Sequence, residues 1–235
     1  MRQAIAMIEL IFAIVIMGIV LMSAPMLIST ASKSGYVAIQ QEAINEASSQ
    51  VNMILGYYWD ESDTNQSEYS AILQTGGDTN LRENNSTAML TGRRFGTPNE
   101  SYRTFLTSDG LRLVASAIGD DAGDIEEDDM DDFDGTTHLE EIQSSPDVHN
   151  VETTTIDIDR NVFYMGDTPE SGNYIDPGDN ELVFNADFSS TPAGTTNIKR
   201  IEITLTSSSG ADELEKKIVL HAFSCNIGSY KLEER

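Results

Sequence analysis

The chain opens with an apolar segment long enough to cross a membrane, and one acidic side chain interrupts it. Residues 5–28 read "IAMIELIFAIVIMGIVLMSAPMLI", in which Glu9 is the only charged residue. As a helix, about 24 residues span roughly 36 Å, more than the roughly 30 Å hydrocarbon core of a bilayer. An ionised carboxylate there costs at least about 2.5 kcal/mol, and more when no cation pairs with it. Any fold must therefore account for both the length of the segment and the position of Glu9.

Two ordinary interpretations explain the length but not the carboxylate. A secretory signal peptide would be cut near the small residues at 29–31, yet it would carry Glu9 inside its apolar region. A single-pass membrane anchor has the right length and gives Glu9 no role. Both interpretations stay open as alternatives to a third one, which rests on the residues around Glu9.

The stretch "QAIAMIELIFAIVIMGIV" (residues 3–20) resembles the N-terminal signal of type IV pilins and of the pseudopilins of type II secretion. The resemblance implies that residues 1–4 are a leader peptide, which a prepilin peptidase removes on the cytoplasmic side. The cut would fall between Ala4 and Ile5, with N-methylation of the new terminus at Ile5. Family leaders usually end in glycine and the first mature residue is usually phenylalanine, so Ala4 and Ile5 depart from the common pattern. The resemblance also implies a helix kink near Pro25, where proline removes a backbone hydrogen bond.

Cleavage at this position would give Glu9 a partner. It creates an α-amine at Ile5, one helical turn before Glu9. During assembly the Glu9 carboxylate of an incoming subunit can meet the α-amine of a neighbouring subunit. The pair then neutralises two charges that membrane burial penalises. Glu9 is thus predicted to be an assembly residue that pairs with another chain.

Hydrophobic periodicity predicts an α+β fold. Residues 5–28 form the transmembrane or filament-core helix, and residues 29–60 continue it as an amphipathic helix. Residues 61–235 form an exported, β-rich globular domain, with β segments predicted at 153–159, 161–165, 181–186, 197–206 and 216–228. In the last two, apolar residues alternate with polar ones. The last two strands are predicted to form a hairpin. The resemblance to pilins implies that the long N-terminal helix packs on a C-terminal antiparallel sheet, whereas periodicity alone also fits a helix packed in any globular core. The apolar stripe of the amphipathic helix is predicted to contain Val37, Ile44, Ala47, Val51, Ile54, Leu55 and Tyr58.

The strongest local composition signal is acidic. The net charge is −25, which argues against nucleic acid as a partner, and residues 120–135 read "DDAGDIEEDDMDDFDG". Such a run is either a solvated loop held open by like charges or a source of oxygen ligands for calcium. An EF-hand frame with Gly135 at its turn fails at the first ligand position, which Met130 occupies. Calcium therefore stays open as a cofactor. Its candidate ligands are Asp124, Asp132, Asp134 and Glu141.

Two polar segments fit an extended acceptor sequence for bacterial N-glycosylation. "DTNQS" and "ENNST" both read Asp/Glu-x-Asn-x-Ser/Thr, with Asn65 and Asn85 as the acceptors. Both segments lie in loop-like sequence, where modification is sterically feasible. The alternative is coincidence in a chain rich in Asn, Ser, Thr and acidic residues. Both interpretations stay open.

The remaining reactive residue types do not form a recognisable catalytic pattern. Cys225 is the only cysteine, so no internal disulfide is expected, and a lone thiol is more often a buried small apolar residue than a reactive one. His138 and His149 lack a third nitrogen or sulfur ligand at zinc spacing. No nucleophile elbow, phosphate loop or dinucleotide fingerprint occurs. The chain is therefore predicted not to be an enzyme.

These inferences together predict a structural minor pilin or pseudopilin subunit. Its expected partners are other pilin or pseudopilin subunits, the prepilin peptidase, the inner membrane and the assembly platform. Its expected location is the bacterial inner membrane with the globular domain in the periplasm, and then the filament. The alternatives are a membrane-anchored calcium-dependent adhesin or surface-binding protein, and an exported hydrolase. The adhesin needs neither cleavage at Ala4 nor Glu9, so its Glu9→Gln variant should behave normally. A hydrolase would lose activity when one carboxylate or histidine is removed, and the sequence offers no candidate geometry for one.

Overall fold

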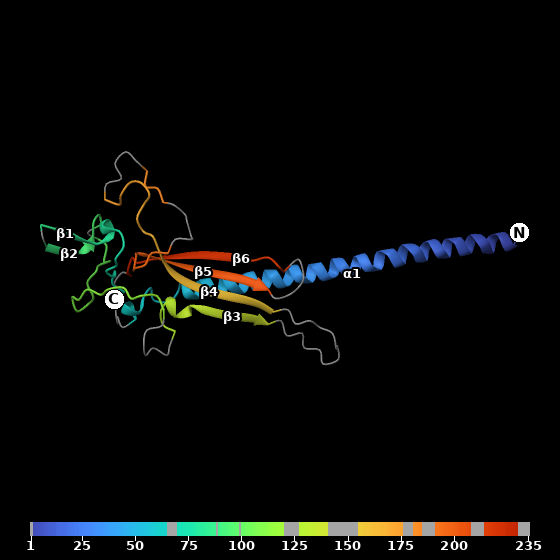
Figure 1. Cartoon of the computed structure of the whole chain (residues 1–235), viewed down its shortest axis with the longest axis horizontal. Helices are drawn as coiled ribbons and strands as arrows, with labels where there is room; N and C mark the ends of the chain where they lie inside the picture. The colour runs from blue at the N-terminus through green and yellow to red at the C-terminus, as the bar shows by residue number, and fades with distance from the viewer. Residues whose placement is uncertain are drawn as a thin grey trace.

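One helix, α1 (Arg2–Ile54), runs for 53 residues and carries a folded head at its C-terminal end (Figure 1). The N-terminal half of α1 extends away from the head, and the C-terminal half lies along the sheet. Helical structure continues through Pro25. The computed structural model describes residues 2–64, 70–87, 89–98, 100–119, 127–140, 155–175, 181–184, 191–207 and 214–229.

The C-terminal half of α1 packs on the sheet through one stripe of side chains. Val37, Leu55 and Tyr58 were predicted on this stripe and are exposed. The first apolar side chain of α1 that packs against the core is Ile39, so Val37 lies before the covered part. The predicted boundary at residue 60 was too late, because α1 ends at Ile54 and a turn follows. The buried side chains are Ala43, Ala47 and Ile54, with Ile39, Ile44 and Val51 partly buried.

The main sheet is antiparallel, with strand order β3-β4-β5-β6. The predicted hairpin of the last two strands is confirmed, because β5 pairs with β6 and places Ile203 opposite Leu220. The two strands predicted at 153–159 and 161–165 are one continuous strand. No strand forms at 181–184, where Val183 makes only an isolated bridge to Ser171. The strands are β3 (Gly135–Glu140), β4 (Thr155–Met165), β5 (Ile198–Ser207) and β6 (Ile218–Cys225).

The core lies between α1 and one face of β4 and β5, which confirms the α+β architecture. Along β4 buried residues alternate with partly exposed ones, as expected for a half-buried strand. On β5 residues 199, 201, 203 and 205 are buried on one face, and Arg200 and Thr204 are buried on the other. Phe133 adds a buried aromatic ring from the segment that precedes β3. The buried apolar side chains of the two strands are Ile156, Ile158, Val162 and Tyr164 of β4 and Ile201, Ile203 and Leu205 of β5.

Short elements complete the head. The 3-10 helix η1 (Glu61–Asp63) follows α1, and η2 (Thr79–Leu81) precedes a hairpin of β1 (Glu83–Ser86) and β2 (Met89–Arg94). A third 3-10 helix, η3 (Asp131–Phe133), leads into β3. Gly135 begins β3 with a φ of 147°, a conformation that residues with a side chain rarely adopt.

Candidate functional site

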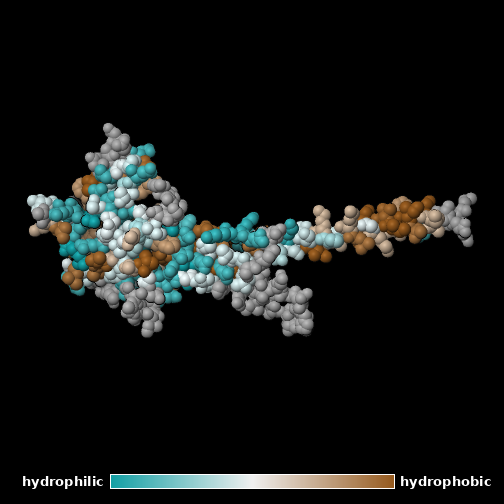
Figure 2. All heavy atoms as spheres, viewed as in Figure 1, coloured by the Kyte–Doolittle hydropathy of each residue, from teal (hydrophilic) through white to brown (hydrophobic). Residues whose placement is uncertain are grey.

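The N-terminal half of α1 presents an apolar surface that the rest of the molecule leaves uncovered (Figure 2). None of the most apolar part of this segment is buried. Large side chains such as Met22 and Leu21 are 84% and 73% exposed. A soluble protein rarely exposes a continuous apolar surface of this size, which marks a membrane or protein contact. The segment is long and apolar enough to serve as a membrane anchor.

Ala4, Ile5 and Glu9, the residues of the predicted processing and assembly site, all lie on α1. Positions four apart share a helix face, so residues 5 and 9 lie one above the other on the same side. The Glu9 side chain is exposed, and within the part of the chain that the structure describes no side chain forms an ion pair with it.

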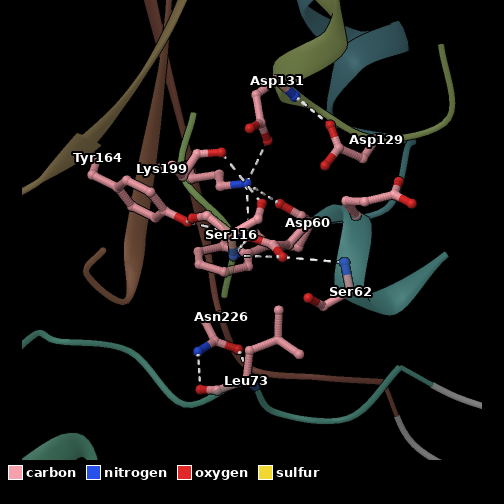
Figure 3. A network of polar contacts seen from close by, with 12 residues as sticks. Asp60, Ser62, Leu73, Ser116, Asp129, Asp131, Tyr164, Lys199 and Asn226 are labelled. Carbon is pink, nitrogen blue, oxygen red and sulfur yellow. Dashed lines mark hydrogen bonds and ion pairs between the residues drawn. The ribbon is translucent and has the colours of Figure 1, made fainter. Parts of the chain in front are cut away.

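A second charged cluster lies inside the head and centres on Lys199 (Figure 3). Lys199 is fully buried, and its Nζ donates hydrogen bonds to the carbonyl oxygen of Trp59 at 2.7 Å and to the carboxylates of Asp60 and Asp131. Its Nζ also lies 4.7 Å from the centroid of the Trp59 ring and 5.4 Å from that of Tyr164. Lys199 thereby ties the chain after α1 and the end of the acidic run to β5.

Asp60 extends this network to another loop. Both oxygens of its buried carboxylate accept from the backbone N–H of Ser116 at 3.1 Å, and Oδ1 also accepts from the N–H of Ser62. The hydroxyl of Tyr164 donates to Asp60 and to the carbonyl of Ser116. Burial raises the pKa of Tyr164, so the phenol keeps the proton that it donates. Asp60 and Lys199 (Figure 3) therefore join five segments of the head through buried, charge-assisted hydrogen bonds: the chain after α1, the loop at Ser116, η3, β4 and β5.

Part of the acidic run is buried, which corrects the alternative that the run is simply a solvated loop. Asp129 and Asp131 are each 2% exposed, and the N–H of Asp131 donates to Asp129. Burial raises the pKa of Asp131, and it raises the pKa of Asp129 to about 7. The pKa of Asp63 in η1 is raised in the same way, to about 7, by burial and by the nearby Asp60. More carboxyl groups than cations therefore surround this part of the core.

The raised pKa values predict that acid stabilises the head. In the folded state Asp63 and Asp129 hold their protons up to about pH 7, whereas their ordinary pKa is 3.8. Their stabilising contribution is complete below about pH 4 and is lost as the pH rises through 7. Each group contributes a slope of at most about 1.4 kcal/mol per pH unit in that window. Urea unfolding at about pH 5 and pH 8 should therefore give the higher free energy of unfolding at pH 5.

The control for this prediction separates Asp63 from the general effect of the negative charge. Asp63→Asn should reduce the pH dependence by the share of Asp63 and leave that of Asp129. Asp134→Asn changes an acid at an exposed position and should leave the dependence as in the unaltered protein. A free energy of unfolding that rises from pH 5 to pH 8 would contradict the assignment.

The predicted calcium ligands are not brought together in the described part of the chain. Asp132 accepts hydrogen bonds from the backbone N–H groups of Asp128 and Asp129 at 2.9 and 3.0 Å, and Asp134 is exposed. Among the described residues, no group of three His, Cys, Asp or Glu side chains has the geometry to hold a metal ion. Asp124 and Glu141 lie outside the described residues.

The other candidate residues are separate from both charged sites. Asn85 is exposed in β1, where a glycan would be accessible, and Asn65 lies outside the described residues, as does His149. His138 lies in β3 opposite Asp157. Cys225 was predicted to be buried and is exposed at the end of β6; its partial enclosure by neighbouring groups raises its pKa and keeps the thiol protonated.

Sequence reasoning missed Lys199 as a structural residue, although the signal was present. Residues 199, 201, 203 and 205 share one face of β5, so the alternation that predicts Ile201 and Ile203 as buried also predicts Lys199 as buried. A lysine on the core face of a strand requires a buried anionic partner. The sequence did not identify that partner, because many carboxylates were candidates.

Comparisons of the chain with models of known protein families, with characterised proteins and with solved structures gave no match.

Proposed function

We propose that the protein is a structural subunit of a type IV pilus or of a type II secretion pseudopilus. The observation that carries the proposal is the uncovered apolar half of α1, which bears the single carboxylate of Glu9 and projects from a folded head. The apolar helix would be held first in the inner membrane and later in the core of a filament. The acidic head, with its share of the net charge of −25, would face the solvent.

The construction of α1 supports this proposal over a simple anchor. The same continuous helix is apolar at one end and is packed into the head through Ala43, Ala47 and Ile54 at the other. A rigid connection of this kind transmits the position of the apolar half to the head, so helices packed side by side would also fix the spacing of the heads. A flexible anchor has no need of such a connection. Other subunits of the same kind are thus the proposed main partners.

The proposal assigns successive partners to the N-terminal segment. A prepilin peptidase would remove residues 1–4 at the membrane, and the assembly platform would then move the mature chain from the bilayer into the filament. In the bilayer the ionised Glu9 is costly. In the filament, the α-amine of Ile5 in a neighbouring subunit would compensate it. The ionised Glu9 thus has a lower electrostatic energy in the filament than in the bilayer, which favours assembly.

The expected mature N-terminus tests this proposal. In cells with an active prepilin peptidase, intact-mass measurement of the membrane-derived protein should give a chain that begins at Ile5, with or without one methyl group. Ala4→Glu should block the cut, because it replaces the small residue before the bond with a charged one, and Ala31→Glu should not affect it. A chain that still begins at Met1, or one cut near Ala31 as a secretory signal would be, would contradict the proposal.

A further inference from the structure

A cavity of about 880 Å³ opens beside the C-terminal end of α1, and the proposed function gives it no role. Its wall combines the residues that follow α1, the η1 helix, the acidic segment before η3 and the chain that follows β6. Residues from distant parts of the sequence thus meet around one hollow. The wall includes Tyr57, Tyr58, Trp59, Asp63, Asp128 and Cys225.

One oxygen of the buried Asp63 carboxyl group, at the wall of this cavity, lacks a hydrogen-bond donor, although the carboxyl group accepts from the backbone N–H of Ala71. Asp63 is 2% exposed, and among the residues that the structure describes none donates a hydrogen bond to its Oδ1. Lys199, the cation of the buried network, is engaged by Asp60 and Asp131. Buried polar atoms without a partner are rare in folded proteins, and one at a cavity wall indicates a missing donor. Asp63 therefore points to a ligand that supplies an N–H group.

The surroundings of Asp63 favour a positively charged donor. Asp128 places a second carboxylate on the cavity wall. The last turn of α1 ends at the same cavity without a basic residue, so the partial negative charge of the helix C-terminus is not offset by a side chain of that turn. These groups act in the same direction, because each attracts a cation and repels an anion.

The aromatic residues of the wall add a second means of binding a cation. Tyr57 and Tyr58 are 38% and 43% exposed, so part of each side chain is accessible. Aromatic faces attract ammonium and guanidinium groups. Trp59, another aromatic residue of the wall, already contacts a cation of the same chain, since the Nζ of Lys199 lies 4.7 Å from the centroid of the Trp59 ring. The cavity thus brings together a carboxylate and aromatic rings, the combination that holds Lys199, and here the tyrosine rings are accessible.

We propose that this cavity binds a lysine or arginine side chain presented by another polypeptide. An organic cation fits better than a metal ion, because among the described residues no three carboxylate, His or Cys side chains converge with metal geometry. The aliphatic stem of the ligand would lie against the tyrosine rings, and its charged end would reach Asp63. The volume of about 880 Å³ exceeds that of one basic side chain, which leaves room for the adjoining main chain.

Two residues of the cavity report binding directly. Trp59 is the only tryptophan and Cys225 the only cysteine of the chain, and both line the cavity. The full-length protein in detergent is titrated with N-acetyl-lysine amide at about pH 8.5, above the pKa of about 7 of Asp63, so that its carboxyl group is ionised while the ligand stays protonated. The ionic strength is fixed at about 0.15 M, which screens general attraction to the negative surface. We expect a saturable change in Trp59 fluorescence and slower alkylation of Cys225. N-acetyl-norleucine amide, which lacks the ammonium group, should produce neither effect.

Substitution tests the role of Asp63. Asp63→Asn should weaken binding of N-acetyl-lysine amide by about tenfold or more, because it removes the charged acceptor. Asp134→Asn changes the net charge equally at an exposed position outside the cavity and should bind as the unaltered protein does. Equal affinity of the two variants would overturn the proposal. So would equal effects of the lysine and norleucine amides on the unaltered protein, a result that does not depend on how the variants fold.

A further titration distinguishes a peptide from a free amine. Butylammonium carries the same charged end and stem without a main chain. It should bind more weakly than N-acetyl-lysine amide, because it cannot form hydrogen bonds through peptide groups. Equal or tighter binding of butylammonium would overturn the assignment to a polypeptide partner.

Discussion

Glu9→Gln should leave the protein in the membrane and reduce its incorporation into filaments by about a hundredfold or more. The substitution keeps the size and hydrogen-bonding capacity of the side chain and removes its charge. The α-ammonium of Ile5 in the neighbouring subunit would then be buried without an anion. Loss of one partner of a buried ion pair costs about 3–5 kcal/mol, which corresponds to at least a hundredfold change in an assembly equilibrium.

The matched control for this experiment is Glu42→Gln. Glu42 is an exposed acid on the same helix, outside its apolar half. Glu42→Gln therefore has the same net charge and the same helix composition as Glu9→Gln. The fraction of each variant in sheared filaments and in membranes can be measured by immunoblot. We expect Glu42→Gln to assemble normally, and both variants to be cleaved after Ala4. Normal incorporation of Glu9→Gln would show that assembly does not need a carboxylate in the apolar segment.

Lys199→Met should lower the free energy of unfolding of the head by about 3–5 kcal/mol at neutral pH. Methionine fills a similar volume, so the main loss is the charge that compensates Asp60 and Asp131. Both carboxylates are buried, so water has little access to them once the lysine is removed. The chain after α1 and the η3 segment should loosen first, because Lys199 holds both of them to β5. Urea unfolding followed by Trp59 fluorescence measures the effect.

Two further variants distinguish lost charge from lost packing. Lys217→Met removes an exposed lysine before β6 and should change the free energy of unfolding by less than about 0.5 kcal/mol. Adding Asp60→Asn and Asp131→Asn to Lys199→Met removes the uncompensated charges and should restore much of the lost stability. A Lys199→Met protein as stable as the Lys217→Met protein would show that the buried network contributes little.

The overall architecture was predictable because it depends on patterns that extend over many residues. The apolar segment predicted the N-terminal helix, and the alternation in β5 and β6 predicted the hairpin. The helix boundary was predicted too late, because an apolar residue such as Tyr58 can continue a pattern after the backbone has turned. The apolar residues at 181–184 suggested a strand, yet without a neighbouring strand to pair with they form only the bridge at Val183.

The buried charges were harder to predict, because tertiary contacts decide which acids are buried. Nothing in the local sequence distinguishes the buried Asp131 from the exposed Asp134 three residues later. The difference arises because Phe133 enters the core and carries η3 with it, which places Asp131 against Lys199. The position of Lys199 itself follows from strand alternation. One partner of the buried network was therefore accessible to sequence reasoning, and the other was not.

The proposed function depends on the same physical rule that the head obeys with Lys199: a carboxylate removed from water needs a cation. In the head the cation comes from the same chain, and for Glu9 it is proposed to come from another subunit. A density map of assembled filaments, at a resolution that shows side chains, tests this most directly. We expect the Glu9 carboxylate to lie within about 4 Å of the Ile5 α-amine of a neighbouring subunit. A Glu9 side chain in solvent, or one paired with a cation of its own chain, would contradict the proposed role.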